Sequence, residues 1–415
     1  MKILYITDIF PPYSSGGADN VAFILAKKMM QLGYEIYVIS TVQDKNEEKE
    51  IEYEGLKIHQ IYTDYDLKVR NYVAVYNPET VKKVRQIVRK IKPDVVHFHI
   101  VHLYLSYACF KVAKKYSKKV FLTAHDMMLV HHDKFREYVQ ANDKSDSPKL
   151  NYKISSWQLF RSAKKRFNPL RRILIKHYLK YIDKIFCVSH ELEKALNANN
   201  IKNTVTIHNG IEAVTNHDQS QIEDFKNKYN LQGKKVIFYA GRLSGSKGGA
   251  VIVKSLSLVK QKVNNAVLLI AGEKSGYANI ISNLAEQLEV SKNIEFTGWL
   301  QKNDMSIAYS SCDVVVVPSL YLDPFPTVNL EAMVNSKPVV GTIFGGTKEA
   351  VVDQETGYIV NPNNVEKFAD KIVDILSNNE LAAKMGEAGK KRVEEVFTLN
   401  NQAKKILEWY NKNNA

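Results

Sequence analysis

A glycine- and serine-rich loop in the second half of the chain carries two cations. Arg242 and Lys247 lie five residues apart within residues 240–249, directly after the apolar run 236–239. Two cations and free backbone amides are what a departing diphosphate requires. A solvated basic loop is the alternative. We favour a diphosphate site, because loops at the carboxyl ends of strands are where open α/β sheets bind ligands.

Two carboxylates follow in a second loop. Asp323 and Glu331 are eight residues apart in the segment 323–331, and Glu331 enters a predicted helix. Carboxylates accept hydrogen bonds from sugar and ribose hydroxyls. They also occur for plainer reasons, with Asp323 as a helix cap and Glu331 as a surface residue. The residue types alone leave these two interpretations even.

Near the amino terminus, Gly16 and Gly17 separate an apolar run from a helical pattern. Glycine lets the backbone approach a phosphate, and the amino terminus of a helix offers unpaired N–H groups. Two glycines in such a loop are also an ordinary turn. Neither a Gly-x-Gly-x-x-Gly motif nor a P-loop is present, so a dinucleotide or triphosphate site is not indicated.

Histidines cluster at the ends of two predicted strands. His97 and His99 share one strand face and His102 follows, but no nearby acid or thiolate completes a metal-ligand set, so we expect no metal. His125 and Asp126 end the next strand. A place in a ligand cleft and a hydrogen-bonded structural role remain equally open for His125.

Strands that alternate with helices must position these groups. The sequence predicts strands at residues 3–6, 34–39, 95–99, 120–123 and 185–188 in the first half, and at 236–239, 267–270, 294–296, 314–317 and 338–340 in the second. This alternation is typical of α/β domains with parallel sheets. A polar stretch near residues 208–218 marks the boundary, and residues 401–410 form a predicted terminal helix.

Length and composition agree with two domains. The 415 residues exceed one ordinary core. The first residues read as a buried strand rather than a signal peptide, and no apolar run is long enough to span a membrane. Cys109, Cys187 and Cys312 are far apart, so the sequence predicts no disulfide framework and fits a reducing cytoplasm.

The formal net charge of +14 is concentrated in one segment. Residues 149–184 contain eleven lysines and arginines against one acid, Asp183, and aromatic and aliphatic residues are interleaved with them. This mixture suits an anionic membrane surface. Nucleic acid is a weaker candidate because no recognisable binding motif is present. Alternatively, the long basic side chains cover a packed helix.

Taken together, the motifs resemble glycosyltransferase family 4 and its GT-B fold. The resemblance rests on an ordered set of segments, residues 239–247, 269–272, 296–298, 318–319, 331–333, 337–342, 345–346 with Glu349, and 357–358. It implies two Rossmann-like domains facing each other across a cleft: residues 1–210 for the acceptor and 211–399 for the nucleotide-sugar. The terminal helix, within residues 400–415, would cross back to the amino-terminal domain.

The resemblance also implies an activity. Members retain anomeric configuration without a metal or cofactor and transfer a hexose from a nucleoside-diphosphate sugar to a glycan or lipid-linked acceptor, here in surface polysaccharide or glycolipid synthesis. Arg242 and Lys247 resemble the diphosphate clamp. Asp323 stands where the family has the acid that contacts the hexose, and His125 matches the histidine near its 6-hydroxyl.

The resemblance further assigns donor-binding residues, which are Gly16, Gly17, Gly272, Phe325, Thr327 and Glu331. Glu331 matches the acid that binds the ribose hydroxyls. Two positions depart from the family: Asp323 replaces the usual glutamate, and Pro326 replaces a glycine. Proline has no N–H group to offer a sugar hydroxyl, so the identity of the donor sugar is left open.

Two rival functions share this fold: a nucleotide-sugar 2-epimerase and a non-catalytic binding subunit. The spacing of Arg242 and Lys247 fits a transferase better than an epimerase. We expect a cytoplasmic enzyme, with peripheral attachment to the inner face of the cell membrane through residues 149–184, and no nucleic-acid partner.

Overall fold

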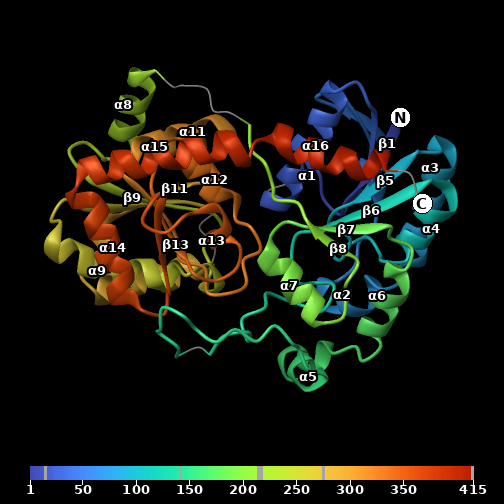
Figure 1. Cartoon of the computed structure of the whole chain (residues 1–415), viewed down its shortest axis with the longest axis horizontal. Coiled ribbons are helices and arrows are strands. Elements are labelled where there is room, and N and C mark those ends of the chain that lie inside the picture. The colour runs from blue at the N-terminus through green and yellow to red at the C-terminus, as the bar shows by residue number, and fades with distance from the viewer. Residues whose placement is uncertain (14–15, 141, 213–217, 273–275, 413–415) are drawn as a thin grey trace. The chain divides into compact units, whose positions relative to one another are not determined.

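The computed structural model describes residues 1–13, 16–140, 142–212, 218–272 and 276–412, and these form two compact units (Figure 1). The first unit contains Met1–Lys134, Tyr152–Asn209 and Leu399–Ala415. The second contains Phe135–Asn151 and Gly210–Thr398. Ser14 and Ser15 of the first glycine loop, and residues 213–217 of the expected junction, lie outside the described residues.

One segment corrects the expected division at residue 210. Phe135–Asn151 was expected in the first domain but belongs to the second unit. The reason is long-range pairing: the backbone N–H of Leu322 donates to the carbonyl of Phe135 at 2.9 Å. The side-chain amide of Asn361 also donates to the carbonyls of Asp143 and Ser145, each at 2.8 Å.

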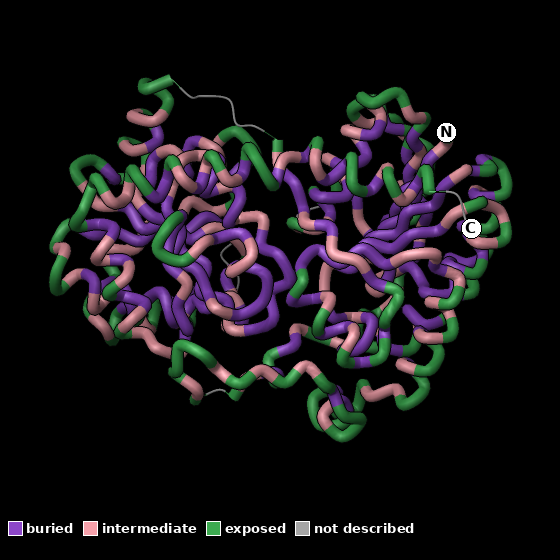
Figure 2. The backbone as a smooth tube through the Cα atoms, viewed as in Figure 1, coloured by how far each residue is buried: buried purple, intermediate pink, exposed green. Residues whose placement is uncertain are grey.

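The first unit is built on an eight-stranded sheet in the order β3-β4-β2-β1-β5-β6-β7-β8. Its strands are β1 (Lys2–Ile6), β2 (Glu35–Val42), β3 (Glu50–Tyr53), β4 (Leu56–Tyr62), β5 (Val95–Phe98), β6 (Lys119–Ala124), β7 (Lys184–Cys187) and β8 (Thr204–Thr206). All neighbours are parallel except β3 and β4. The central strands are continuous apolar runs and are buried, as expected for a parallel sheet covered on both faces (Figure 2).

The hairpin of β3 and β4 was not predicted from the sequence. Its turn is made by Glu54 and Gly55, both with positive φ (47° and 81°). β3 is polar and lies at the edge of the sheet, so it lacks the apolar run that marks the other strands. Such a strand is recognisable only from its pairing with β4.

The helices of the first unit connect the parallel strands. They are α1 (Gly17–Gln31), α2 (Arg70–Val73), α3 (Pro78–Ile91), α4 (Cys109–Tyr116), α5 (Ser156–Ala163), α6 (Arg171–Leu179), α7 (His190–Ala198) and α16 (Leu399–Asn411), with short 3-10 turns η1 (Lys45–Glu47), η2 (Leu67–Val69) and η3 (Lys164–Arg166). α3 begins with Pro78 at its first turn, and the side chain of Asn77 accepts a hydrogen bond from the N–H of Thr80. Both are standard start signals of a helix.

The second unit repeats this architecture with a six-stranded parallel sheet in the order β11-β10-β9-β12-β13-β14. Its strands are β9 (Lys235–Ala240), β10 (Ala266–Ala271), β11 (Ile294–Gly298), β12 (Val314–Val317), β13 (Val339–Thr342) and β14 (Gly357–Val360). Its helices are α8 (Gln219–Lys228), α9 (Gly249–Lys262), α10 (Gly276–Gln287), α11 (Lys302–Ser311), α12 (Thr327–Val334), α13 (Thr347–Ala350), α14 (Val365–Ser377) and α15 (Asn379–Val396), with 3-10 turns η4 (Gly245–Lys247) and η5 (Ser291–Asn293). Two Rossmann-like units are therefore present, as predicted.

The last helix, α16, crosses back to the first unit, which confirms the prediction. Leu399, Ala403 and Ile406 belong to the core that also contains residues of β1 and β5. The hydroxyl of Tyr410 lies 2.6 Å from Nδ1 of His97, on β5. Among the described helices, none is both long and apolar enough to cross a membrane.

Packing of α16 on the first unit leads to a prediction about stability. Ile406 is 1% exposed, so Ile406→Ala removes buried methyl groups and should lower the free energy of unfolding by about 2–5 kcal/mol. Hydrogen exchange should rise in α1 and β1. Glu408→Ala, on the exposed side of the same helix, is the control and should change stability by less than about 0.5 kcal/mol. Equal effects of the two substitutions would contradict the packing.

Candidate functional site

The strand order of the second unit places two loops next to each other. β9 pairs with β10 on one side and with β12 on the other. From β9 the chain adds β10 and β11 toward one edge of the sheet and then β12, β13 and β14 toward the other, so the strand order reverses between β9 and β12. Loops that leave the carboxyl ends of two such strands diverge around a crevice, where α/β sheets bind ligands. Here the backbone N–H of Leu320 donates to the carbonyl of Ser246 at 2.8 Å and ties the loops together.

An ion pair joins these two loops. Nζ of Lys247, after β9, lies 2.6 Å from Oδ2 of Asp323, after β12. The hydroxyl of Ser319 donates to the same oxygen at 2.7 Å. Asp323 is 4% exposed, and a carboxylate at that depth requires such partners. The ammonium of Lys247 is therefore held in place, 5.4 Å from the centre of the Tyr321 ring.

Two glycines, one after β9 and one after β13, allow their backbone to lie against the loop after β12. Gly248 has φ +78°, and a Cβ atom there would lie 2.0 Å from the carbonyl oxygen of Pro318. Gly345 has φ +72°, and its Cβ would lie 2.0 Å from the carbonyl oxygen of Asp323. Any side chain at either position would force the loops apart, so both glycines are required by the backbone geometry.

Arg242 and Glu331 complete the second-unit set. The Arg242 side chain is exposed and forms no hydrogen bond or ion pair with any residue that the structure describes. Glu331, on α12, is partly buried and accepts a hydrogen bond from the hydroxyl of Tyr309 at 2.7 Å. Burial, reinforced by this carboxylate, raises the pKa of Tyr309. Glu331 is thus a positioned acid rather than an ordinary surface residue.

The remaining donor-site predictions lie at loop ends of the same unit. Gly272 follows β10, and its N–H donates to the carbonyl of Gly298 at 3.0 Å. Phe325 is buried, with its ring centre 5.6 Å from that of Phe397. Thr327 begins α12, whose N-cap is Pro326, without a side-chain cap. Asp323 is therefore not the cap of this helix, which removes the plainer interpretation of that residue.

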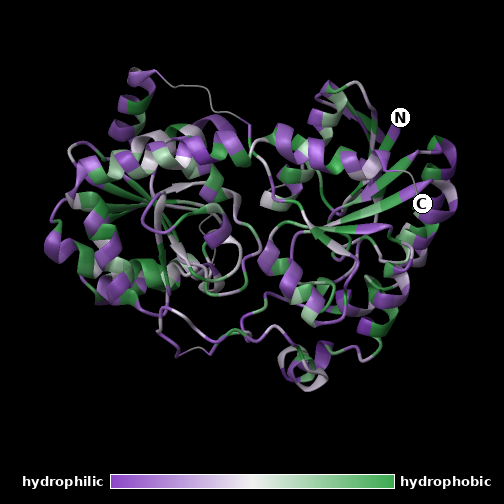
Figure 3. Ribbon diagram, viewed as in Figure 1, coloured by the Kyte–Doolittle hydropathy of each residue, from purple (hydrophilic) through white to green (hydrophobic). Residues whose placement is uncertain are grey.

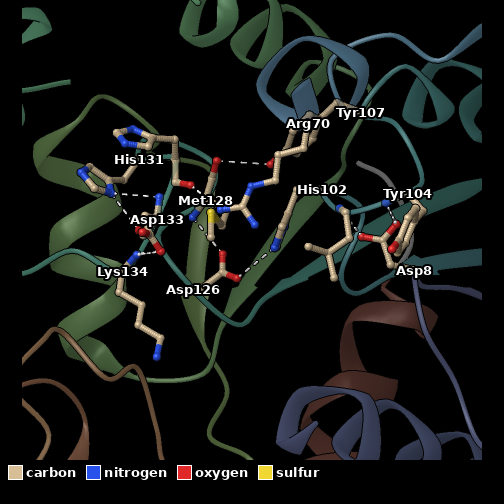
Figure 4. A network of polar contacts seen from close by, with 12 residues as sticks. Asp8, Arg70, His102, Tyr104, Tyr107, Asp126, Met128, His131, Asp133 and Lys134 are labelled. Carbon is tan, nitrogen blue, oxygen red and sulfur yellow. Dashed lines mark hydrogen bonds and ion pairs between the residues drawn. The ribbon is translucent and has the colours of Figure 1, made fainter. Parts of the chain in front are cut away.

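In the first unit, a second buried aspartate lies at the corresponding reversal of strand order. β1 lies between β2 and β5, and Asp8 follows β1. Its carboxylate accepts hydrogen bonds from the backbone N–H groups of Leu103 (2.7 Å), Tyr104 (2.8 Å) and Leu105 in the loop after β5 (Figure 4). Burial raises the pKa of Asp8, and His102 and the three amides oppose that shift.

His125 lies in a small pocket of the first unit. The pocket is lined by His99, Ile100, Val101, His102, Tyr107, Leu122, Thr123, Ala124, His125, Asp126 and Leu129. Nε2 of His125 is 2.9 Å from Nδ1 of His99. Asp126 lies 3.3 Å from Nε2 of His102 (Figure 4). Burial lowers the pKa of His125 to about 4, against the opposing effect of Asp126. The imidazole is therefore neutral near pH 7 and available for hydrogen bonding.

The other strand histidine, His97, has a structural role. Its Nδ1 lies 2.6 Å from the Tyr410 hydroxyl and its Nε2 lies 2.7 Å from Oγ1 of Thr123. Both ring nitrogens are occupied, so His97 has none left for a metal. His99 shares its strand face, as predicted, with ring centres 4.5 Å apart. Its Nε2 is buried and has no hydrogen-bond partner among the described residues.

Gly16 and Gly17 occupy the expected place between β1 and α1. Gly16 is the N-cap of α1, without a side-chain cap, and Gly17 is the first helical residue. A Cβ on Gly16 would lie 2.7 Å from a carboxylate oxygen of Asp19. This acid in the first turn complements the positive end of the helix.

The structure thus brings Arg242, Lys247 and Asp323 onto the two loops of the second-unit crevice. Gly16, Gly17 and His125 lie in the other unit. The sequence did not predict several residues that hold these side chains in place. They are Ser319, Tyr309, Asp8 and His99, the last of which contacts His125. Their one available signal was position, because Asp8, His99 and Ser319 each follow the end of a strand.

Two family profiles match the chain. "Glycosyltransferase Family 4" matches residues 15–214, and "Glycosyl transferases group 1" matches residues 221–392. The chain belongs to the family 4 type of glycosyltransferases. The two profiles meet near the division between the units and together span most of the chain.

Relatives with similar sequences match different fractions of this chain. An uncharacterised glycosyltransferase of Methanocaldococcus jannaschii, MJ1607, is 27% identical over 423 residues, which cover 99% of this chain and 98% of that protein. Two Bacillus subtilis proteins, YtcC and spore coat protein SA, are 33% identical over 194 residues and 26% identical over 222 residues. These matches cover 45% and 51% of this chain, but only 47% and 59% of those proteins.

Solved structures share the fold along the whole chain. Sucrose-phosphate synthase from Thermosynechococcus elongatus has a TM-score of 0.76 at 19% identity and covers 99% of this chain, with 98% of its own chain matched. Anabaena HepE, solved in complex with UDP, has a TM-score of 0.73 at 17% identity, with 99% of each chain covered. At these identities the likeness establishes the GT-B fold of the chain and nothing about its activity.

The lowered pKa of His125 predicts a dependence of stability on pH. An unfolded histidine takes up a proton below its ordinary pKa of 6.5, whereas folded His125 does so only near 4. The unfolded state therefore binds more protons in this window, and His125 makes the protein less stable as the pH falls through it, by roughly 1–3 kcal/mol. His125→Gln should weaken that dependence. In an NMR titration, a His125 ring that becomes protonated near pH 6.5 would contradict the prediction.

Proposed function

We propose that the protein is a retaining, metal-independent hexosyltransferase that uses a nucleoside-diphosphate sugar. The observation that carries the proposal is the fixed ammonium of Lys247 on the same loop as the exposed Arg242, at the strand-order reversal of the second unit. Two cations held at that place suit a diphosphate. The UDP bound to the Anabaena neighbour supports the same class of donor.

In the proposed reaction, the bond between the anomeric carbon and the terminal phosphate oxygen of the donor breaks. Negative charge develops on the leaving diphosphate, and Lys247 and Arg242 stabilise that charge. The acceptor hydroxyl attacks the anomeric carbon from the same face, and its proton passes to the departing phosphate. This route retains configuration and requires no metal, because the two side chains supply the positive charge.

The carboxylates have separate roles in this proposal. Glu331, oriented by the Tyr309 hydroxyl, binds the ribose hydroxyls. Oδ2 of Asp323 is taken up by Lys247 and Ser319, which leaves Oδ1 for a hexose hydroxyl. Asp323 therefore both positions Lys247 and contacts the sugar. Because it is one methylene shorter than glutamate, we propose that it selects among hexoses.

The first unit supplies the acceptor side in this proposal. The amino terminus of α1, at Gly16 and Gly17, faces the phosphate in this proposal, and neutral His125 offers a hydrogen bond to the sugar. The acceptor is a glycan or lipid-linked sugar, and surface polysaccharide or glycolipid synthesis is the corresponding role. The shared cleft expected from the family remains a prediction.

The diphosphate assignment predicts the effect of two substitutions. Arg242→Ala and Lys247→Ala should each lower turnover at least about tenfold, because each removes a charge that stabilises the leaving group. Lys254→Ala, which removes an exposed cation from α9, is the matched control and should keep turnover. The measurement is release of nucleoside diphosphate from UDP-, GDP- and ADP-sugars, with circular dichroism to check folding.

Product analysis of the same nucleotide-sugars, incubated without an acceptor, separates the rival functions. An epimerase would interconvert free nucleotide-sugars without an acceptor, and a binding subunit would take up nucleotide yet release no diphosphate. Near-wild-type turnover of both the Arg242 and Lys247 variants would mean that the diphosphate lies elsewhere.

Metal independence gives a separate prediction. Activity should be unchanged by EDTA, because Arg242 and Lys247 provide the charge that a divalent cation supplies in other transferases. The control is a parallel reaction to which Mg²⁺ or Mn²⁺ is added back. Complete loss of turnover in EDTA, restored by either metal, would overturn the metal-free mechanism while leaving the donor class open.

A further inference from the structure

Two short helices of the first unit expose apolar faces. On α5, Trp157 and Phe160 are exposed on one side, while Leu159 and Ala163 are buried on the other. The exposed fraction of Trp157 is 68%. A helix that only covers a core turns its apolar residues inward, so the outer face of α5 is not explained by packing within this unit.

The same pattern recurs on the next helix. Leu170, Ile173 and Leu174 follow helical spacing and are exposed, with fractions of 57%, 65% and 37%. Ile175, on the same helix, is buried. Figure 2 shows α5 largely exposed and α6 with exposed, intermediate and buried residues, and Figure 3 shows both hydrophobic and hydrophilic residues along α6. Adjacent exposed apolar residues of this number indicate an interaction surface.

An aromatic cluster links α5 to the segment that follows η3. The rings of Trp157 and Phe160 stack with centres 5.6 Å apart, and Phe160 meets Phe167 edge-on at 5.5 Å. We call the exposed side chains of Trp157, Phe160, Leu170, Ile173 and Leu174, together with the partly buried Phe167, the apolar surface.

The connection between the helices is held to α2. The hydroxyl of Tyr72 donates to the carbonyl of Phe167 at 2.6 Å, and the side-chain amide of Asn71 donates to the carbonyl of Arg166 at 2.9 Å. Asn168 returns a hydrogen bond from its side chain to the carbonyl of Asn71 at 2.9 Å. The backbone that carries the cations between α5 and α6 is therefore fixed.

Exposed cations adjoin the apolar surface. They are Arg161, Lys164, Lys165 and Arg166, at the end of α5 and in η3. Residues 147–182 contain no aspartate or glutamate. Asp66 interacts electrostatically with Arg166 and is also paired with Lys68 at 3.5 Å. Positive charge therefore dominates beside the exposed aromatic and aliphatic side chains.

The structure corrects the sequence-based count of eleven available cations. Arg171 is 6% exposed and donates to the carbonyls of His131 (3.0 Å) and Met128 (2.5 Å). Arg172 donates to the carbonyl of Ile154 at 2.9 Å. These two arginines hold the first unit together, so they do not belong to a binding surface, and a test that replaced them would confuse binding with folding.

We infer that α5, η3 and α6 form a docking surface for an anionic lipid bilayer. Tryptophan and phenylalanine suit the boundary between headgroups and acyl chains, and lysine and arginine at the same depth meet anionic headgroups. A folded protein partner of this chemistry would need an acidic, apolar groove. The bilayer supplies both properties over any area, and it accommodates side chains on two separate helices. This inference does not rest on the proposed donor chemistry.

Vesicle flotation of the full chain, without nucleotide-sugar, tests the inference. The wild type should float with vesicles of phosphatidylcholine and phosphatidylglycerol at low salt, and should bind several-fold less at high salt or to phosphatidylcholine alone. Changing Arg161, Lys164, Lys165 and Arg166 to glutamine should lower binding at least about tenfold. Changing Trp157 and Phe160 to serine should lower it at both salt concentrations.

A charge-matched control decides whether location matters. Lys82, Arg85 and Arg89 of α3 and Lys111 of α4 are exposed cations of the same unit, and their change to glutamine removes equal charge. This control should float like the wild type. Equal loss in both quadruple variants would overturn the inference, as would a wild type that stays with the unbound fraction at low salt.

Two further readouts separate lipid binding from self-association. Trp157 emission should shift to the blue with anionic vesicles, measured as the difference from Trp157→Phe. Sedimentation without lipid should give one species for the wild type and the Trp157→Ser and Phe160→Ser double variant. If the wild type instead self-associates and this variant does not, the apolar surface joins two copies of the chain and the lipid inference is wrong. Nucleoside-diphosphate release by the quadruple variant in solution, on a soluble acceptor, reports separately on the proposed function.

Discussion

The ion pair between Asp323 and Lys247 is the interaction on which the second-unit site depends. Reversal of the strand order between β9 and β12 places their loops side by side, and the pair then fixes one loop to the other. A buried carboxylate without partners would cost several kcal/mol, so Asp323 constrains both Lys247 and Ser319. The arrangement converts a flexible lysine into a fixed cation, whereas the side chain of Arg242 is exposed. A charge that is already oriented before the leaving group forms loses little to reorganisation.

The first unit has a buried aspartate, Asp8, in the same topological position, but this aspartate has a different role. Asp8 also lies where the strand order reverses, yet its carboxylate is satisfied by backbone amides of residues 103–105 rather than by a cation. It therefore fixes the path of the loop after β5, which runs from His99 through His102. Those histidines contact His125 and Asp126. A buried aspartate at the strand-order reversal thus positions a cation in the second unit and the loop beside the neutral imidazole of His125 in the first.

Sequence patterns predicted most of the fold because apolar runs and helical spacing are local signals. Every strand predicted from such a run is present, and α16 packs where the family resemblance implied. The polar edge strand β3 and the transfer of Phe135–Asn151 to the second unit were missed, since both depend on long-range pairing. The candidate site shows the same limit. Spacing pointed to Arg242 and Lys247, and the family resemblance pointed to Asp323, but the hydrogen bonds that tie Asp323 to Ser319 and Lys247 arise only from the folded loops.

The basic character of the chain shows why a count of charges is not a count of binding residues. Nζ of Lys119 donates to the carbonyls of Tyr410 and Lys412, at 2.7 and 2.6 Å, and so complements the negative end of α16. Arg171 likewise donates hydrogen bonds to backbone carbonyls, those of His131 and Met128. The sequence alone does not show that these residues lie beside it. Lys247 is committed to Asp323. Once cations with such partners are set aside, the positive charge that faces outward beside exposed apolar residues is concentrated in a short stretch around η3. Burial, rather than abundance, therefore determines which basic residues are available to meet another molecule.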